Sequence, residues 1–418
     1  MKILYFKVDG FKNIENAHID LTDITTFMAL NSKGKSNLLK GILFGLLIIS
    51  NIQSTRNAIY QLNNSLSKPL NNSSKHKDFF FEVCGKTKLD DEDVLVFYSF
   101  TLRWDQKVTT ITSENLRVQY NDSQRPITFY IRNEEEARYK TTKARSADNI
   151  ISPINSFDMF NNVLLGKKLY YESIIKEIAN VKYAIDRHFD NALTYNAVPI
   201  FQDDDFSFCG NKPENTPQNL YLLKTSYPQY FKRIINAMKI LFPEVSEIDV
   251  KKVNADTINV IGVQNYYLLY AKENHIDSYI NCTEMSDGFK RILNNLIFLS
   301  ISEIKGLQVV ALEEPENSIN PTVLGKYIQI IAEFTDSFNI ILTSHSPFLL
   351  QYIDLRKIYI GIENQNGNIS FKKIKPTYIK RVTERSEKLE VTTGTYIFDM
   401  LSNEEKFDHE ILKNALED

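Results

Sequence analysis

Apolar runs of strand length alternate with longer periodic segments along much of the chain, and this pattern predicts an α/β fold. The clearest example has the runs LQVVAL, at residues 307–312, and FNIILTS, at residues 338–344, on either side of PTVLGKYIQIIAEF. A short apolar run bounded by turn signals is typical of a buried parallel strand, and the longer segment between the two suits the crossover helix. The region 307–344 therefore predicts a strand, a helix and a second parallel strand.

Polar side chains follow both of these predicted strands. Glu313 and Glu314 come directly after the first run, and His345 comes directly after the second. Because open α/β sheets bind ligands at the carboxyl ends of their strands, we expect these groups to line one crevice. Two carboxylates beside a histidine suit a metal-bound phosphate and an attacking water. The alternative is an ordinary buried unit whose end residues have no chemical role.

The N-terminal pattern predicts another strand, loop and helix. Residues 3–11 and 17–21 alternate like strands around a turn at Lys12 and Asn13, and the run TTFMAL leads through NSKGKSN into LLKGILFGLLI. This order places the loop at a helix amino terminus. Further along, residues 79–83, 94–104 and 108–120 predict an antiparallel meander, residues 171–189 and 229–242 predict two amphipathic helices, and residues 357–374 predict a hairpin.

Composition narrows the class of protein without settling the function. The net charge of −3 gives no overall basic field, so charge does not indicate a nucleic-acid partner, although a local patch stays open. Cys84, Cys209 and Cys282 are too scattered for a disulfide framework and favour a reducing cytosol. The apolar stretch GILFGLLIIS is too short to span a bilayer, so we expect a cytoplasmic chain without a membrane partner.

The loop at residues 29–36, ALNSKGKS, is close to the phosphate-binding pattern G-x-x-x-x-G-K-[ST]. Gly34 lets backbone N–H groups approach phosphate oxygens, Lys35 meets the β and γ phosphates of a nucleotide, and the Ser36 hydroxyl can coordinate Mg²⁺. Ala29 stands where the pattern has its first glycine. The alternative is a basic surface loop. The predicted nucleotide contacts of this segment are Asn31, Ser32, Lys33, Gly34, Lys35, Ser36 and Asn37.

A second candidate anion site begins at Ser286. The segment MSDGFKR places Ser286 as the N-cap of the apolar-periodic helix that follows, with Gly288 two residues on. The simple interpretation is a helix start. The other is that this capped helix terminus meets the γ phosphate of a nucleotide held by another subunit.

The phosphate loop, the signature-like SDG, EEPE and SHSPFLL occur in an order that resembles the ABC-type ATPase heads of the SMC, RecF and OLD group, particularly stand-alone AAA-type ATPases of bacteria. The resemblance implies an ABC-type P-loop NTPase head with an antiparallel β subdomain and a helical insertion, and no fused nuclease domain. The implied division is 1–134 for the N-terminal part of the head, 135–240 for the helical insertion, and 241–418 for the C-terminal part.

The resemblance also implies roles for single residues. Glu313 takes the metal-side position, Glu314 orients or activates water, and His345 is the switch histidine that contacts the γ phosphate. Asn320 falls in the dimer-facing loop. Lys12 and Asn13 resemble the N-terminal turn near the nucleotide base. With Lys35, Glu314 and His345 form the implied catalytic set, and Ser36 and Glu313 the implied metal ligands.

The predicted function is Mg²⁺-dependent ATP binding and hydrolysis that drives dimerisation, or higher oligomerisation, of heads. No effector domain is evident, so we expect the chain to control a separate effector such as a nuclease or toxin, in a bacterial antiphage system by family analogy. One alternative is an ATP-gated scaffold with little hydrolysis, suggested by Ala29 and by glutamate at Glu313. Another is an SMC- or RecF-like DNA-repair ATPase.

Overall fold

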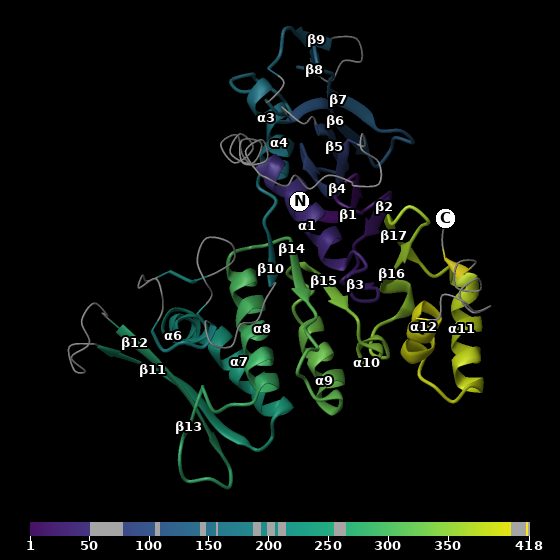
Figure 1. The fold of residues 1–418 in the computed structure, drawn as a ribbon. Coiled ribbons are helices and arrows are strands. Elements are labelled where there is room, and N and C mark those ends of the chain that lie inside the picture. Colours follow the sequence, from purple (N-terminus) through teal and green to yellow (C-terminus); the bar gives the residue numbers. More distant parts are fainter. Residues whose placement is uncertain are drawn as a thin grey trace. The chain divides into compact units, whose positions relative to one another are not determined.

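Two compact units make up the chain in the computed structural model (Figure 1). Unit 1 comprises Met1–Tyr183 and Asp354–Asp418, and unit 2 comprises Ala184–Ile353. The structure describes residues 1–50, 78–104, 109–142, 148–155, 158–186, 194–198, 205–207, 215–254, 265–402 and 415–416. Cys209 lies outside these residues, and Cys84 and Cys282 are free and buried.

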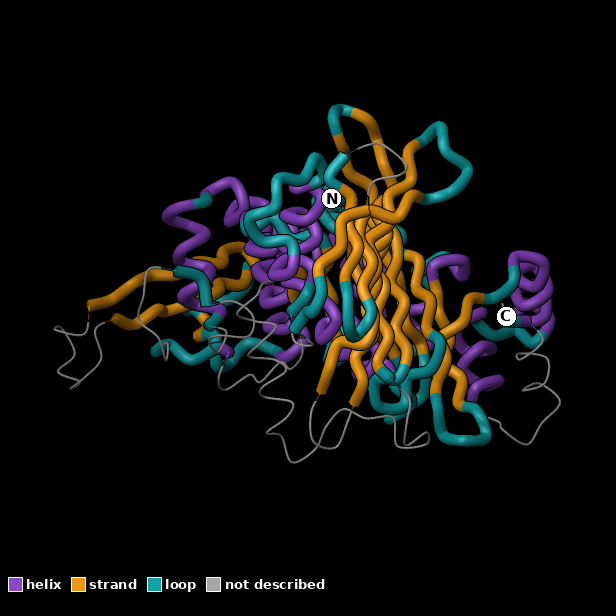
Figure 2. The backbone as a smooth tube through the Cα atoms, turned by 90° about the horizontal axis from the view of Figure 1, so that it is seen from above, coloured by secondary structure: helices purple, strands orange, loops and turns teal. Residues whose placement is uncertain are grey.

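An antiparallel sheet of eight strands forms the larger part of unit 1, and Figure 2 shows its strands running side by side. Its order is β2-β1-β4-β5-β6-β7-β8-β9. The strands are β1 (Lys2–Asp9), β2 (Ala17–Asp20), β4 (Phe79–Leu89), β5 (Glu92–Trp104), β6 (Thr109–Tyr120), β7 (Ile127–Arg132), β8 (Ala137–Lys140) and β9 (Asp148–Ile151). The predicted meander is therefore confirmed.

Helix α1 (Lys35–Ser50) packs on β1 and β4 of this sheet. A Cβ atom on Gly45 of α1 would lie 2.2 Å from the Phe81 ring, so the glycine allows the close approach of helix and sheet. The buried aromatic rings of Phe6, Phe79 and Phe100 surround Phe81 and fill this layer. The helices α3 (Phe160–Val163) and α4 (Glu172–Ala179) belong to the same unit.

The smaller part of unit 1 holds the strand that leads into the phosphate loop. β3 (Ile24–Met28) is buried along its whole length, pairs in parallel with β16 (Ile358–Glu363), and β16 pairs antiparallel with β17 (Ile369–Lys373). The predicted C-terminal hairpin is thus confirmed. The remaining elements are the 3₁₀ helix η2 (Leu355–Lys357), α11 (Pro376–Lys388) and α12 (Thr393–Ser402).

Unit 2 contains the parallel pair predicted from residues 307–344. β14 (Val309–Glu313) pairs in parallel with β15 (Asn339–Ser344), and α9 (Pro321–Ala332) is the crossover helix. β10 (Tyr183–Asp186) starts at the unit boundary and lies beside β14. The other elements are α6 (Thr216–Ser226), α7 (Pro228–Leu241), α8 (Asp287–Ile304), α10 (Pro347–Leu350), and an antiparallel sheet of β11 (Val245–Asn254), β12 (Asn265–Glu273) and β13 (Ile280–Asn281).

The long helix predicted over 171–189 is wrong. Helix α4 ends at Ala179 with Asn180 at its C-cap, and Tyr183–Asp186 is strand β10; residues 187–189 lie outside the described part. Asparagine is common at helix ends, and the alternating burial of the four β10 residues follows the two-residue period of a strand. Segment 135–240 accordingly holds strands β8, β9 and β10 besides its helices.

The predicted mixed α/β class, with an antiparallel sheet and several helices, is confirmed. The division at 134 and 240 stays a prediction. Across the residues that the structure describes, no helix is long and apolar enough to cross a membrane.

Candidate nucleotide site

The loop between β3 and α1 has the backbone shape of a phosphate cradle. Ser32 and Gly34 have positive φ angles of 62° and 80°, and the N–H of Leu38 donates to the Gly34 carbonyl at 2.8 Å, which starts α1. A Cβ atom on Gly34 would lie 2.9 Å from the Ile369 side chain, so glycine is favoured here by both its backbone angle and its size. No acidic residue lies in the first turn of α1. The amino terminus of this helix therefore suits an anion.

The Lys35 ammonium lies inside the curve of this loop. Its side chain is buried, and Nζ donates to the carbonyls of Ala29 at 2.8 Å and Leu30 at 3.2 Å. Ser36, the next residue, is exposed, and Asn37 is half-buried. The loop thus combines a buried cation, backbone donors and an accessible hydroxyl, which are the groups that a nucleotide phosphate with Mg²⁺ requires.

Ala29 fits the loop without strain. The positive φ angles of the loop fall at Ser32 and Gly34 and not at Ala29, so the backbone at position 29 accepts a side chain. A Cβ on Gly361 of β16 would lie 2.9 Å from the Ala29 Cβ, so Gly361 provides the space that the Ala29 methyl group occupies. The missing glycine of the sequence pattern therefore leaves the cradle intact.

The N-terminal turn lies against the phosphate loop. The Asn37 side-chain amide donates to Asn13 Oδ1 at 2.8 Å, and Lys12 has a positive φ of 52°. Burial lowers the pKa of Lys12, and the nearby positive charge of Lys40 lowers it further. The structure therefore brings Asn37 of α1 next to the turn of Lys12 and Asn13. An anion bound here would reduce the repulsion between Lys12 and Lys40.

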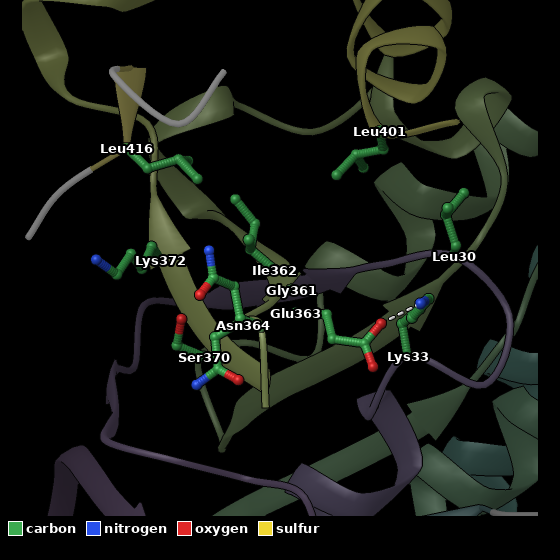
Figure 3. A pocket seen from close by; sticks show the side chains of 11 residues that line it. Leu30, Lys33, Gly361, Ile362, Glu363, Asn364, Ser370, Lys372, Leu401 and Leu416 are labelled. Carbon is green, nitrogen blue, oxygen red and sulfur yellow. Dashed lines mark hydrogen bonds and ion pairs between the residues drawn. The ribbon is translucent and has the colours of Figure 1, made fainter. Parts of the chain in front are cut away.

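A cavity of about 590 Å³ borders the other side of the loop through Leu30 and Lys33. Figure 3 shows Leu401 and Leu416 at one side of this cavity and the ion pair between Lys33 and Glu363 at the other. Because Glu363 engages the Lys33 ammonium, we expect Lys33 to contribute to phosphate binding through its backbone rather than its charge. The two lysines of the loop, Lys33 and Lys35, thus differ in their partners.

In unit 2, the ends of β14 and β15 bring the predicted carboxylate and histidine into contact. His345 Nδ1 lies 3.1 Å from Glu314 Oε1, and about a third of each side chain is exposed. Glu314 has a positive φ of 48°, which is uncommon for a residue other than glycine. Its N–H donates to the Thr343 carbonyl at 3.0 Å. Strained backbone held by hydrogen bonds is frequent where a side chain must be aimed.

Glu316 is a residue of this site to which the sequence gave no role. It is 7% exposed, and its Oε1 accepts a hydrogen bond from Ser344 Oγ at 2.6 Å. Ser344 Oγ in turn accepts from the Ser346 N–H at 2.9 Å, so Glu316 fixes the turn that carries His345. Burial raises the pKa of Glu316. The position of Glu316 in the motif EEPE was the only sequence signal for it.

The start of α8 confirms the simple interpretation of Ser286. Its side chain caps the helix by accepting from the Phe289 N–H at 3.3 Å, and the residue is exposed. Gly288 has a packing role, because a Cβ there would lie 2.5 Å from the Ser318 carbonyl oxygen. This close contact joins the signature-like helix to the loop after β14. Contact of Ser286 or Gly288 with a nucleotide stays a prediction.

The predicted metal ligands are hard oxygen donors, a hydroxyl at Ser36 and a carboxylate at Glu313. They belong to unit 1 and unit 2, respectively. Among the described residues, no group of three His, Cys, Asp or Glu side chains could hold a metal ion. This donor set fits Mg²⁺, which usually binds few protein oxygens together with substrate phosphates.

Comparison with known proteins gives one partial family match. The family described as "AAA domain, putative AbiEii toxin, Type IV TA system" matches residues 176–351, which is less than half of the chain. The comparison with curated proteins finds no match to this sequence. The family match agrees with the predicted resemblance to AAA-type ATPases, and the absence of a fused nuclease domain stays a prediction.

Solved structures of SMC heads are similar to the chain at low identity. The SMC head domain from Thermotoga maritima has a TM-score of 0.43 at 12% identity, with 90% of this chain and 100% of that chain covered. An SMC head bound to the C-winged helix domain of ScpA has a TM-score of 0.48 at 12% identity, with 91% and 100% covered. An SMC head with an extended coiled coil, bound to the C-terminal domain of ScpA from Pyrococcus furiosus, has a TM-score of 0.45 at 11% identity, with 93% and 99% covered.

Proposed function

We propose that the chain is a Mg²⁺-dependent ATPase. The observation that carries the proposal is the contact between Glu314 and His345, which follow two neighbouring parallel strands. Glu314 Oε1 and His345 Nδ1 lie 3.1 Å apart. A carboxylate with an imidazole beside it can orient a water molecule and sense a phosphate. The loop around Lys35, in unit 1, supports the proposal separately, because it combines a buried ammonium with the backbone shape of a phosphate-binding loop.

The residues of the proposed site have separate tasks. The N–H groups at the start of α1 and the Lys35 ammonium hold the β and γ phosphates, and Lys12, Asn13 and Asn37 lie where they can meet the rest of the nucleotide. Ser36 and Glu313 would hold Mg²⁺, and its charge would offset the charge that develops on the phosphates. Glu314 orients the attacking water, and His345 contacts the γ phosphate.

We further propose that two heads close on ATP. Ser286 at the start of α8 and Asn320 at the start of α9 are both exposed, and the contact between Gly288 and Ser318 joins the two helix starts in unit 2. Ser286 of one subunit then meets the nucleotide of the other. ATP shifts the equilibrium towards the dimer because it makes contacts in the closed state that the open state lacks.

We propose that the dimer controls a separate effector protein, such as a nuclease or toxin, in the bacterial cytoplasm as part of antiphage defence. The description of the matching family, which names a toxin and a toxin–antitoxin system, supports this assignment. The net charge of −3 does not favour an obligate nucleic-acid partner.

The test is Glu314→Gln in the full chain. We expect turnover of Mg-ATP to fall by at least about 100-fold, because general-base or water-orienting groups contribute that much, while ATP still binds and the dimer lives longer. Steady-state phosphate release, equilibrium ATP binding and sedimentation with ATP are the measurements. Glu333→Gln, which removes an exposed carboxylate at the end of α9, is the control. Unchanged hydrolysis in Glu314→Gln contradicts the assigned role.

A further inference from the structure

We infer that Arg291 is a positioning residue for Glu314. Arg291 projects from α8, the helix that starts at Ser286, and reaches the carboxyl end of β14. There it holds the backbone next to Glu314, the proposed water-orienting residue. The inference rests on the proposed function for its chemical consequence, although the geometry stands by itself. All residues that carry it belong to unit 2.

Both ends of the peptide group between Glu313 and Glu314 are held. Arg291 Nη2 donates to the Glu313 carbonyl at 2.7 Å. The N–H of the same peptide group, on Glu314, donates to the Thr343 carbonyl at 3.0 Å and contacts Thr343 Oγ1 at 3.2 Å. A planar peptide group with both polar atoms bound cannot rotate without losing hydrogen bonds. Arg291 and Thr343 therefore fix the direction in which the chain enters Glu314.

This direction matters because Glu314 has an unfavourable backbone conformation. Its φ of 48° is in the left-handed region, which a residue with a Cβ adopts only when the surroundings enforce it. The same conformation places Oε1 at 3.1 Å from His345 Nδ1. If the Glu313 carbonyl lost its donor, the peptide group could relax and the carboxylate would move away from the histidine.

Arg291 is itself held in a buried environment by an acidic residue. Its side chain is 6% exposed, and Asp186 Oδ2, on a side chain that is 2% exposed, lies 4.0 Å from Nη2. A buried guanidinium requires such a counter-charge, and its planar donors keep their orientation better than a flexible ammonium does. Asp186 belongs to β10, the neighbour of β14 in the sheet. Arg291 of α8 thus links Asp186 of β10 to the Glu313 carbonyl at the end of β14.

The placement of Arg291 on α8 has a consequence for the dimer. Arg291 follows Gly288, whose close contact with the Ser318 carbonyl binds the helix start to the loop after β14. A displacement of α8 when Ser286 meets the partner subunit's nucleotide would pull directly on the Glu313 carbonyl. Arg291 would in this way transmit a movement of α8 to Glu314 when the heads close.

The test compares Arg291→Gln with Arg233→Gln in the full chain. Arg233 is a matched control, because it also pairs with a carboxylate, Glu303 at 3.0 Å, and also donates to a backbone carbonyl, that of Glu333 at 3.1 Å. The first readout is amide hydrogen exchange of Glu314 without nucleotide. We expect Arg291→Gln to speed this exchange about 10-fold, the effect of losing one supporting hydrogen bond, and Arg233→Gln to leave it unchanged. Equal exchange in wild type and Arg291→Gln overturns the inference.

The second readout is a double-mutant cycle on turnover. Arg291→Gln alone is expected to lower kcat about 10- to 100-fold with little change in ATP binding, because misplacement of a reacting group has effects of this size. In the Glu314→Gln background, Arg291→Gln should cause no further loss. Equal losses in both backgrounds would show that Arg291 acts independently of Glu314, and the inference would be wrong.

A second variant covers loss of folding. Arg291→Gln leaves the Asp186 carboxylate buried without its counter-charge, whereas Arg291→Gln with Asp186→Asn removes both charges and should give the same two results. Failure of the proposed function has a different signature. Glu314→Gln would then turn over ATP as wild type does, while the hydrogen exchange of Glu314 would still respond to Arg291.

Discussion

The two candidate regions, the phosphate loop of unit 1 and the Glu314–His345 pair of unit 2, are held in different ways. In unit 1 the phosphate loop is a contiguous segment, and its shape comes from the backbone: positive φ angles at Ser32 and Gly34, and the start of α1. In unit 2 the Glu314–His345 pair depends on separate elements: the carbonyl and hydroxyl of Thr343 hold the Glu314 backbone, and the Glu316 carboxylate holds the turn that carries His345.

This difference in support suggests that the unit 1 loop serves nucleotide binding and that the unit 2 residues serve the chemical step. A phosphate can be held by backbone donors in a short loop, and such a loop tolerates changes such as Ala29 as long as its backbone conformation persists. A reacting water needs a carboxylate aimed in one direction, and this requires supports from several elements. We therefore expect substitutions in unit 1 to alter nucleotide affinity and substitutions in unit 2 to alter turnover.

Lys35→Ala should have the largest effect. It removes the buried ammonium. We expect ATP affinity to fall about 100-fold, because hydrogen bonds to a charged group contribute binding free energy of this order. Lys33→Ala is the matched control, because this lysine of the same loop is engaged by Glu363 and should change affinity by less than about 3-fold. Equilibrium ATP binding measures both. Equal losses of ATP affinity in the two variants would show that the loop binds phosphate through its total charge and not through its backbone shape.

Gly288→Ala should destabilise the fold by about 2 kcal/mol, because the added Cβ meets the Ser318 carbonyl oxygen, a backbone atom that cannot move alone. Gly34→Ala should cost about 1 kcal/mol through its positive φ, since the nearest atom there is the end of the flexible Ile369 side chain. Denaturant unfolding of both variants gives the comparison. A larger loss of stability in Gly34→Ala would contradict the expectation that a clash with backbone at Gly288 costs more than a positive φ angle at Gly34.

His345→Gln should lower kcat about 10-fold while ATP affinity changes little, because it removes one charge-assisted contact to the γ phosphate and the partner of Glu314. Single-turnover phosphate release and equilibrium binding separate the two quantities. If affinity fell as much as kcat, His345 would belong to the binding half of the site.

Glu316→Gln should make stability less dependent on pH. Burial raises the pKa of Glu316 above its ordinary value of 4.5, so the wild-type protein loses stability as pH rises from 4.5 through the raised value. The variant keeps an acceptor for Ser344 and lacks the buried charge, so its stability relative to wild type should increase as the pH rises through this window. Denaturant unfolding at pH 4 and pH 8 tests this, with Glu333→Gln as a variant that should show no such change.

The sequence predicts the parts of the fold and site that depend on local patterns. The buried run of β3, the loop after it, and the strand–helix–strand order of β14, α9 and β15 follow from apolar periodicity and turn residues. The Ser286 cap was also predicted, because capping needs only residues of one helix turn.

Features that depend on distant residues were missed. The sequence predicts the end of a helix where strand β10 lies, because the spacing of its apolar residues also fits a helical face and its pairing with β14 is not visible in the sequence. Arg291 and Asp186 have no spacing that reveals their contact. Glu316 gained a role only when the structure placed Ser344 beside it.

Mg²⁺-dependent phosphate release from ATP by the full chain tests the central claim most directly. At saturating ATP the account predicts steady release with Mg²⁺, none with a chelator, and ATP binding without release in Glu314→Gln. Wild-type protein that binds Mg-ATP yet releases no phosphate above background would contradict the account and favour a nucleotide-gated scaffold.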